Sequence, residues 1–511
     1  MLSVPSHVRI SLYALILALF AAFYVIIYLS ALDLPGRYAY PLGWWGWVDQ
    51  GLYLKSAQAL ARLDFRSSEH WYPIAYSALA APFVKKMAIH PFFVIDLACF
   101  LVVVGGFLKI GSKVVGLVPS ALIFLAVICF PWVLAPHWVI PWTSTLSAAI
   151  TTFLLVACAN ERFVRGFLPL WRYLAFGLLT GILALVRPLD FAIDLVMFGY
   201  IALRCLGTAY ANNEFLLSRR LCGIAAALAA SACVGPLAMA AFNWAVYGSV
   251  ISTYVQVSQD SGFTLSIVPQ KIVSLFNDSE SLFMVRRQTF IAGYPWLVAS
   301  IAMIPTVLAF GSNILRLITT IACVHFAMYL AYGDLIPNNI YLFGTIHYFK
   351  LWMPYLALVA AAGLLHFMRT RNTPKVRIVA LAGALVAGLL CSLGFRLVEE
   401  PIKITQVGPL SIVIERVARS QVSIAYIDFP NLVSDDFPKY EAGRSQFIAD
   451  GERLRRLGDF RLLKGEVGAR ALFTAPLKFR RLEIVLDDSF KIPPGITGNA
   501  VHYEIGLRWP F

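Results

Sequence analysis

The sequence predicts a mainly α polytopic membrane protein that ends in a small α+β domain. Of its 511 residues, 59% are hydrophobic and 14% are charged, and the mean hydropathy is +0.73, values far from those of a soluble domain. Apolar runs of roughly 17 to 25 residues, the length that crosses a bilayer, recur as far as residue 395 and then stop. We therefore expect a transmembrane domain at 1–395 and a C-terminal domain at 396–511.

About eleven segments of the transmembrane domain are apolar enough to be predicted as spans. They lie near 10–31, 91–109, 114–135, 143–159, 173–187, 189–204, 221–243, 294–311, 313–332, 351–368 and 377–395. The Lys- and Arg-rich loops fall on one side of these spans, which the positive-inside rule assigns to the cytoplasm. In a bacterial inner membrane, an odd number of crossings from a cytoplasmic N-terminus places the first loop (32–90) and the C-terminal domain in the periplasm.

Neither the net charge nor the cysteine content points to nucleic-acid binding or to a cysteine-based site. The net charge of +14 lies mostly in the transmembrane domain, since residues 396–511 hold 17 Lys and Arg against 15 Asp and Glu. Cytoplasmic loops account for such an excess, so we do not expect nucleic-acid binding. The eight cysteines lie in or beside apolar runs without a CxxC pair, so no disulfide framework or zinc site follows from them.

The C-terminal domain has its own pattern of secondary structure. Apolar and polar residues alternate in 422–429 and 481–490, which predicts strands, whereas 441-EAGRSQFIADGERLRRLGDF-460 is typical of a helix. A domain of roughly 110 residues is large enough to hold its own core.

The first loop concentrates the residues that are candidates for chemistry, in the stretch 43-GWWGWVDQGLYLKSAQALARLDF-65. Its aromatic residues are typical of the membrane interface, and Tyr53 and Ala57 share a helical face opposite Lys55, as in a helix that lies on the membrane. Asp49 has two compatible interpretations. It is a helix N-cap, or it is a general base beside aromatic rings, Trp47 among them, that can stack on sugars.

Several motifs, taken in order, resemble the GT-C superfamily of integral membrane glycosyltransferases that use polyprenyl-phosphate sugars, of the aminoarabinose, mannosyl and galacturonosyl transferase type. Tyr72, Pro73 and Tyr76 match that family's first-loop aromatic-proline motif, whereas Ile74 and Ser77 stand where the family has prolines. The segments that carry the resemblance are 47-WVDQGLYLKSAQALARLDF-65, 70-HWYPIAYSALAAPF-83, 183-LALVRPLDF-191, 243-NWAVYGS-249 and 347-HYFKLWMPYLALVAAAGL-364.

The resemblance implies a GT-C-like helical bundle with periplasmic interfacial helices. It also implies transfer of a sugar from a polyprenyl-phosphate donor to an acceptor, usually with inversion, where the acceptor is lipid A, another envelope glycan or a protein. Asp49 matches the family's first-loop acid and would be the general base. Polyprenyl phosphate leaves as a stable anion, so the site needs cations there more than a general acid.

Candidate residues for the donor phosphate are Lys350, His347, Arg187 and Lys55. Other candidates for substrate contact or loop structure are Trp47, Tyr53, His70, Tyr72 and Arg287. His347 stands where the family often has Arg. Lys350 is equally interpreted as a snorkelling interfacial cation, and Arg187 as the ion-pair partner of Asp190 and Asp194. We expect no cofactor and no metal, because the sequence offers no carboxylate cluster outside the membrane.

Two residue types inside the apolar runs are unusual. Asp96 is ionisable and stays unassigned. Gly177 and Gly181 form a GxxxG pattern, which predicts close helix packing within the chain rather than dimerisation.

Two other classes of function remain open from the sequence. A transporter or flippase would also be polytopic and basic, although no inverted repeat or pair of broken helices is visible. A non-catalytic scaffold for glycan assembly would bind its partner through the C-terminal domain, and replacement of Asp49 would then be silent.

Overall fold

The chain folds into two compact units. The first consists of helices, and the second combines helices with a large sheet. The computed structural model describes residues 6–32, 43–130, 134–212, 215–283, 289–333, 335, 342–417, 422–434, 446–454, 460–464, 468–486 and 490–507. The first unit comprises Met1–Val255, Trp296–Phe326 and Ile346–Val386, and the second comprises Gln256–Pro295, Ala327–Thr345 and Ala387–Phe511. The predicted boundary at residue 395 stays a prediction, and the second unit also draws on two earlier segments.

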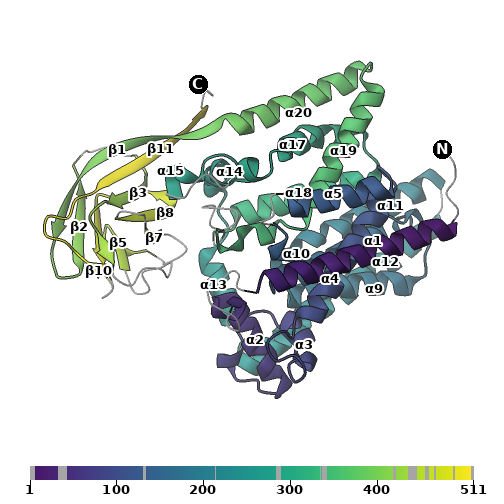
Figure 1. Cartoon of the computed structure of the whole chain (residues 1–511), viewed down its shortest axis with the longest axis horizontal. Helices are drawn as coiled ribbons and strands as arrows, with labels where there is room; N and C mark the ends of the chain where they lie inside the picture. The colour runs from purple at the N-terminus through teal and green to yellow at the C-terminus, as the bar shows by residue number, and fades with distance from the viewer. Residues whose placement is uncertain are drawn as a thin grey trace. The chain divides into compact units, whose positions relative to one another are not determined.

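The first unit is helical (Figure 1). Its elements are α1 (Ser6–Ser30), η1 (Gly43–Gly46), α2 (Val48–Ala61), α3 (Ala75–Ala80), α4 (Phe93–Gly111), α5 (Leu117–Cys129), α6 (Pro136–Val139), α7 (Thr143–Cys158), α8 (Glu161–Val164), α9 (Leu170–Ile182), η5 (Leu183–Leu185), α10 (Pro188–Asp194), α11 (Val196–Asn212), α12 (Phe215–Tyr247), α17 (Leu297–Phe310) and α19 (Trp352–Thr370). Helices α13 (Thr253–Ser261), α18 (Asn313–Ala331) and α20 (Pro374–Ser392) each extend into the second unit.

Five helices in the described part of the chain are long and apolar enough to cross a membrane. They are Ile10–Ser30, Phe93–Gly111, Arg219–Tyr247, Asn313–Ala331 and Pro374–Ser392. Shorter apolar helices include Leu117–Cys129, Thr143–Cys158, Leu170–Leu185 and Leu297–Phe310. The protein is thus an integral membrane protein, and the count of eleven spans stays a prediction. The span predicted at 189–204 is divided between α10 and α11.

The GxxxG pattern marks helix packing inside the first unit, as predicted. A Cβ added at Gly181 would lie 2.5 Å from the carbonyl oxygen of Ala232 in α12, and one added at Gly177 would lie 2.6 Å from that of Leu228. Small residues let the backbones of α9 and α12 approach this closely.

Asp96, which the sequence left unassigned, has a structural contact. It is buried in α4 and accepts hydrogen bonds from the Tyr76 hydroxyl at 2.8 and 3.0 Å.

The second unit is built on an antiparallel sheet of nine strands in the order β6-β5-β9-β2-β1-β11-β3-β8-β7. These are β1 (Leu393–Gln406), β2 (Ser411–Arg416), β3 (Ile424–Phe429), β5 (Gln446–Ala449), β6 (Glu452–Arg453), β7 (Phe460–Lys464), β8 (Ala469–Leu477), β9 (Arg481–Val485) and β11 (Asn499–Leu507), and β4 (Val433–Ser434) pairs with β10 (Phe490–Lys491). The strands predicted at 422–429 and 481–490 are confirmed as β3 and β9.

The helix predicted at 441–460 is wrong wherever that segment is described. Residues 446–449 form β5 and 452–453 form β6, joined at Asp450 and Gly451, whose φ angles are 49° and 92°. An Asp-Gly pair with both φ angles positive is the favoured two-residue hairpin turn, so local turn geometry overrides the helical periodicity.

Helices still pack on the sheet, but they are α14 (Val268–Phe276) and α15 (Ser279–Phe283). The α+β character predicted for 396–511 is therefore corrected, since its described residues beyond Leu393 contain strands and no helix.

Candidate functional site

Tryptophans fix the start of the first loop. Trp44 is buried and its indole N–H donates to the carbonyl of Ala31 at 2.5 Å, while that of Trp45 donates to the carbonyl of Ile89 at 2.8 Å. The turn η1, which carries both tryptophans, is thereby tied to the residue just after α1 and to the approach to α4. These two rings hold the loop in place by specific contacts with protein, beyond the interfacial role that the sequence suggests.

Asp49 lies in the first turn of α2 and is half-buried. The N-cap of this helix is Trp47, which makes no side-chain capping bond, so the interpretation of Asp49 as the cap is wrong. A carboxylate in the first turn still interacts favourably with the helix dipole. Its Oδ1 accepts a hydrogen bond of 2.5 Å from the hydroxyl of Tyr72.

Tyrosine rings surround this carboxylate. The ring of Tyr53 lies 4.8 Å from that of Tyr72, which lies 5.1 Å from that of Tyr254. Burial, and after it the charge of Asp49, raises the pKa of Tyr53 and of Tyr72 well above the ordinary value. Both phenols therefore stay protonated and able to donate at physiological pH. A hydrogen bond with Thr143 and the charge of Arg187 act on the pKa of Tyr53 in the opposite direction, so this residue interacts with Asp49 and also with a second group of polar residues.

Contacts from α2 lead to the segment that precedes α7. Gln50 is buried and donates its amide to the carbonyl of Pro141 at 3.0 Å. The ring of Trp142 lies 5.6 Å from that of Trp47 and 3.8 Å from that of His347. The structure thus brings two predicted site residues from distant parts of the sequence, Trp47 and His347, onto the same tryptophan.

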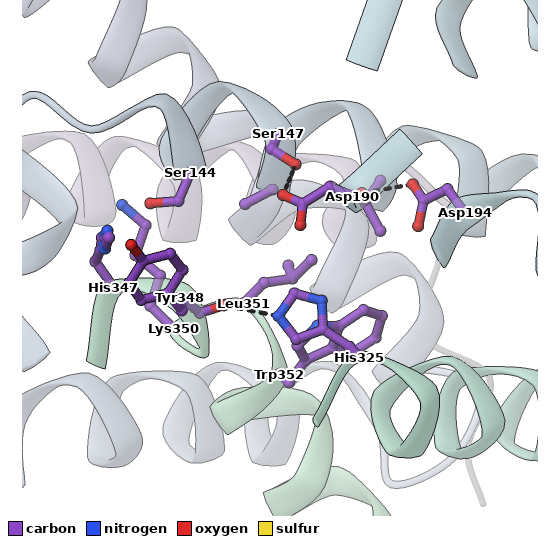
Figure 2. Close-up of a pocket in the computed structure, with 12 residues that line it drawn as sticks. Ser144, Ser147, Asp190, Asp194, His325, His347, Tyr348, Lys350, Leu351 and Trp352 are labelled. Atoms are coloured by element: carbon purple, nitrogen blue, oxygen red, sulfur yellow. Dashed lines mark hydrogen bonds between the residues drawn. The ribbon is translucent and has the colours of Figure 1, made fainter. Parts of the chain in front are cut away.

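A polar pocket with about 310 Å³ of empty space lies in the first unit (Figure 2). Its lining comes from α7, α10, α18 and the segment before and at the start of α19, namely Ser144, Ser147, Ala148, Thr151, Asp190, Asp194, His325, His347, Tyr348, Lys350, Leu351 and Trp352. Serine and threonine recur at intervals of three and four residues along 143-TSTLSAAITT-152, so they form one polar face of α7. This helix presents its N-terminus, and its backbone N–H groups, near the same residues.

Lys350 and His347 line one end of the pocket. Lys350 is only 1% exposed, so it does not snorkel; it donates to the Thr145 hydroxyl at 2.6 Å and to the carbonyl of His137 at 2.9 Å. Burial lowers its pKa to about 7. His347 is also buried, and burial followed by the charges of Arg187 and Lys350 holds its pKa well below the ordinary value, so the imidazole is neutral. The ammonium of Lys350 is therefore the proton-dependent charge at this end.

Arg187 forms the ion pair with Asp190 that the sequence suggested, whereas its role at a donor phosphate stays a prediction. Its Nε lies 3.1 Å from Oδ2 of Asp190, and its guanidinium lies 4.7 Å from the centre of the Tyr348 ring. Asp190 also accepts from the hydroxyl of Ser147 at 2.5 Å. The ion pair therefore holds Arg187 beside the pocket residues, where its charge acts on His347 and Lys350.

The other predicted site residues have structural contacts in the first loop or are not described. His70 is buried and uses both ring nitrogens, with the Ser56 hydroxyl at 2.9 Å and the Asp64 carbonyl at 2.8 Å. Lys55 donates to the carbonyl of Ser68 and lies 3.4 Å from Glu69. Arg287 lies outside the described residues.

Several pocket residues were not among the sequence-based candidates: Ser144, Ser147, Thr151, His325 and Trp352. The signal that would have found the first three is the polar face of α7 in an otherwise apolar run. His325 and Trp352 carry no comparable signal, because a lone histidine or tryptophan in an apolar span is most often part of the core. Within the described ranges, no group of three or more His, Cys, Asp or Glu side chains could hold a metal ion.

No family model and no curated protein matches this chain. Among solved structures, it is similar to ArnT from Cupriavidus metallidurans bound to undecaprenyl phosphate, with a TM-score of 0.42 and 14% sequence identity. The match covers 73% of this chain and 64% of that chain, so it spans less than two thirds of that structure.

Proposed function

We propose that this integral membrane protein is a glycosyltransferase that moves a sugar from a polyprenyl-phosphate donor to an acceptor on the periplasmic side of a bacterial inner membrane. The observation that carries the proposal is the carboxylate of Asp49, which accepts a hydrogen bond from Tyr72 at 2.5 Å and interacts with Tyr53, a residue that also interacts with Thr143 and Arg187. The resemblance of the sequence motifs to polyprenyl-phosphate-dependent glycosyltransferases supports the same reaction.

The donor phosphate is placed at the end of the pocket that holds Lys350 and His347, with Arg187 beside it. Lys350 supplies a positive charge when protonated, and the N-terminus of α7 adds backbone N–H donors. His347 is neutral and so contributes a hydrogen bond rather than a charge. These groups stabilise the phosphate as it leaves, which removes the need for a general acid.

The chemical step is a single displacement at the anomeric carbon. The acceptor hydroxyl oxygen forms a bond to this carbon, the bond from the carbon to the phosphate oxygen breaks, and its electron pair stays on the polyprenyl phosphate. Asp49 takes the proton of the acceptor hydroxyl as that oxygen attacks. The product is a glycoside of inverted configuration, and neither a cofactor nor a metal takes part.

Tyr72 is a positioning residue for this base. Its phenol stays protonated, so it donates to one oxygen of Asp49 and fixes the direction of the carboxylate. The acceptor is lipid A, another envelope glycan or a protein, and Trp47 and Tyr53 offer aromatic faces to sugar rings.

Mass spectrometry of envelope lipids and glycans tests the proposal. Cells that lack the protein are complemented with the wild type, with Asp49→Asn or with Asp64→Asn at matched membrane levels. Asp64 is a suitable control because it lies in the same loop and its carboxylate pairs with the exposed Arg66. We expect one sugar to disappear in the null strain, to return with the wild type and Asp64→Asn, and to stay absent with Asp49→Asn.

Two results would contradict the proposal. Full restoration by Asp49→Asn would show that Asp49 is not the general base and would favour the scaffold alternative. An unchanged glycan profile in the null strain, together with altered distribution of a lipid-linked substrate across the membrane, would favour the flippase alternative.

A further inference from the structure

The pocket described above has two chemically different ends (Figure 2). Lys350, His347 and Ser144 lie together at one end. Asp194 lies at the other end with Asp190 between, and His325 and Trp352 lie below the two carboxyl groups in this view. The phosphate proposed for the first end does not account for the acceptor oxygens of Asp190 and Asp194 at the second, because a phosphodiester has no hydrogen to donate to them.

Three buried polar atoms of this pocket have no hydrogen-bond partner within the described part of the chain. They are the indole N–H of Trp352, which is 1% exposed, the hydroxyl of Ser144, 6% exposed, and Nδ1 of His347, 4% exposed. A buried polar group without a hydrogen bond destabilises the fold, so such groups are rare unless a ligand or water satisfies them. The indole N–H can only donate, which requires an acceptor on the ligand.

The carboxylates supply acceptors beside these donors. Oδ2 of Asp190 accepts from Ser147 at 2.5 Å, and Oδ2 of Asp194 accepts from the Thr151 hydroxyl at 2.7 Å. Asp190 and Asp194 are four residues apart on α10, and Ser147 and Thr151 are four apart on α7, so each helix contributes one face. A carboxylate offers about four acceptor positions, so Asp194 can accept further bonds from a ligand.

We infer that this end of the pocket binds the sugar of the donor, and that the sugar is a single uncharged, polyhydroxylated ring. The inference rests on the proposed function and extends it to the class of sugar. A hydroxyl group both donates and accepts, so a ring bearing several can satisfy Trp352 and Asp194 together. A uronic acid would place its carboxylate against Asp190 and Asp194. An amino sugar would bring an ammonium group into a buried site where Arg187, 3.1 Å from Asp190, already balances the charge of that carboxylate.

The size of the pocket limits the ligand to one ring at most. Its empty space of about 310 Å³ includes solvent at the open mouth, and the phosphate occupies part of it. An oligosaccharide would therefore have to extend beyond the pocket.

Binding to the purified full-length protein in lipid nanodiscs tests the inference. The probes are polyprenyl phosphate, polyprenyl-phosphate glucose, and the same lipid carrying glucuronic acid or 6-amino-6-deoxyglucose. We expect the neutral sugar to raise affinity above that of polyprenyl phosphate by about tenfold or more, as one or two hydrogen bonds to charged or buried groups would. We expect neither the acidic nor the amino sugar to do so.

Variants identify the residues responsible. Trp352→Phe removes the N–H but keeps an aromatic ring, and Asp194→Asn keeps the shape but replaces one acceptor oxygen with an amide donor. Each is expected to abolish most of the gain from glucose while affinity for polyprenyl phosphate is unchanged. The matched controls are Trp171→Phe, on the exposed face of α9, and Asp64→Asn, in the first loop. Unchanged binding of polyprenyl phosphate also shows that each variant is folded.

The outcomes separate this inference from the proposed function. Failure of the wild type to bind polyprenyl phosphate would overturn both. Binding of polyprenyl phosphate with no gain from glucose, or the same gain in Trp352→Phe and Asp194→Asn as in the wild type, would overturn the sugar site alone. A larger gain from the acidic or the amino sugar would overturn the assignment to an uncharged ring.

Discussion

The hydroxyl of Tyr72 donates a hydrogen bond of 2.5 Å to Oδ1 of Asp49, a residue 23 positions earlier in the chain. This contact joins the start of α2 to the loop that precedes α3. The hydroxyl lies in a largely buried environment and stays protonated, because burial and the adjacent carboxylate raise the pKa of Tyr72. The two residues therefore form one unit in which the tyrosine sets the direction of the carboxylate.

Tyr72→Phe is expected to lower kcat by roughly 10- to 100-fold while KM for the donor changes little. The substitution keeps the ring but removes a hydrogen bond to a charged group, a loss worth roughly 1.5–3 kcal/mol. Steady-state kinetics of sugar transfer with the purified protein measures the effect. Tyr13→Phe is the control, because it too removes one tyrosine hydroxyl bond, to the carbonyl of Gly105. Equal kcat values for the two variants would show that Tyr72 does not position the base.

Lys350 is expected to make donor binding weaken as pH rises. Its pKa of about 7 means that the ammonium fraction falls from about 90% at pH 6 to about 10% at pH 8. Affinity for a lipid phosphodiester, which has no second ionisation near neutrality, should fall by roughly tenfold across this range. The sign for stability follows from the same lowered pKa: the folded state loses its proton first, so the free energy of unfolding rises with pH between about 7 and 10.5.

Lys350→Arg is the informative variant for this prediction. Guanidinium stays charged throughout the range, so binding should become nearly independent of pH between 6 and 8. Lys350→Met should bind weakly at every pH. A fall as steep in Lys350→Arg as in the wild type would assign the pH dependence to another group.

The membrane fold and the candidacy of Asp49 as a general base can both be predicted from local features of the sequence. Length and hydropathy fix which segments can cross a bilayer, and an isolated carboxylate beside aromatic residues is visible as a local pattern. The contact of Trp142 with both Trp47 and His347 cannot be predicted in this way, because it depends on tertiary packing of three distant segments. The same holds for the pairing of Thr151 with Asp194.

The wrong helix at 441–460 has a different cause. Phe447 and Ala449 are buried, and Ile448 between them is less so, an alternation too short to outweigh the charged residues that follow. The Asp450-Gly451 pair was the available signal, since such a pair favours a tight hairpin. In this segment the turn preference of the Asp-Gly pair outweighs the helical periodicity of the apolar residues.

In the second unit, Arg470→Lys is expected to lower the free energy of unfolding by roughly 2 kcal/mol. The Arg470 guanidinium contacts both carboxylate oxygens of Asp428, at 2.6 and 2.8 Å, and the carbonyls of Ser281 and Leu282 in α15, at 2.9 and 2.8 Å. An ammonium group cannot reproduce this fork, so some of these groups lose their partner. Thermal unfolding in detergent measures the difference, with the exposed Arg480→Lys as control. Indistinguishable melting temperatures would show that Arg470 does not tie α15 to the sheet.

Gly235→Ala is expected to destabilise the first unit by roughly 1–3 kcal/mol and to lower activity as well. A methyl group at Gly235 in α12 would overlap the backbone carbonyl of Gly181 in α9, which cannot rotate away, so the two helices must separate. Helix α9 leads through η5 to Arg187, and the hydroxyl of Tyr247 at the end of α12 donates to the carbonyl of His70 at 2.7 Å. Separation of the helices would therefore move both Arg187, which lies beside the proposed phosphate site, and the first loop.

The matched control for this prediction lies on the same helix. Gly223 in α12 has nothing within 4 Å of an added Cβ, so Gly223→Ala should be neutral or stabilise the helix by up to about 1 kcal/mol. Thermal unfolding and donor turnover are measured for both variants. If Gly235→Ala matched Gly223→Ala in both, the close contact of α9 and α12 would not be needed for stability or for the placement of Arg187. If Gly235→Ala lost stability alone, the helices would support the fold without setting the geometry of the pocket.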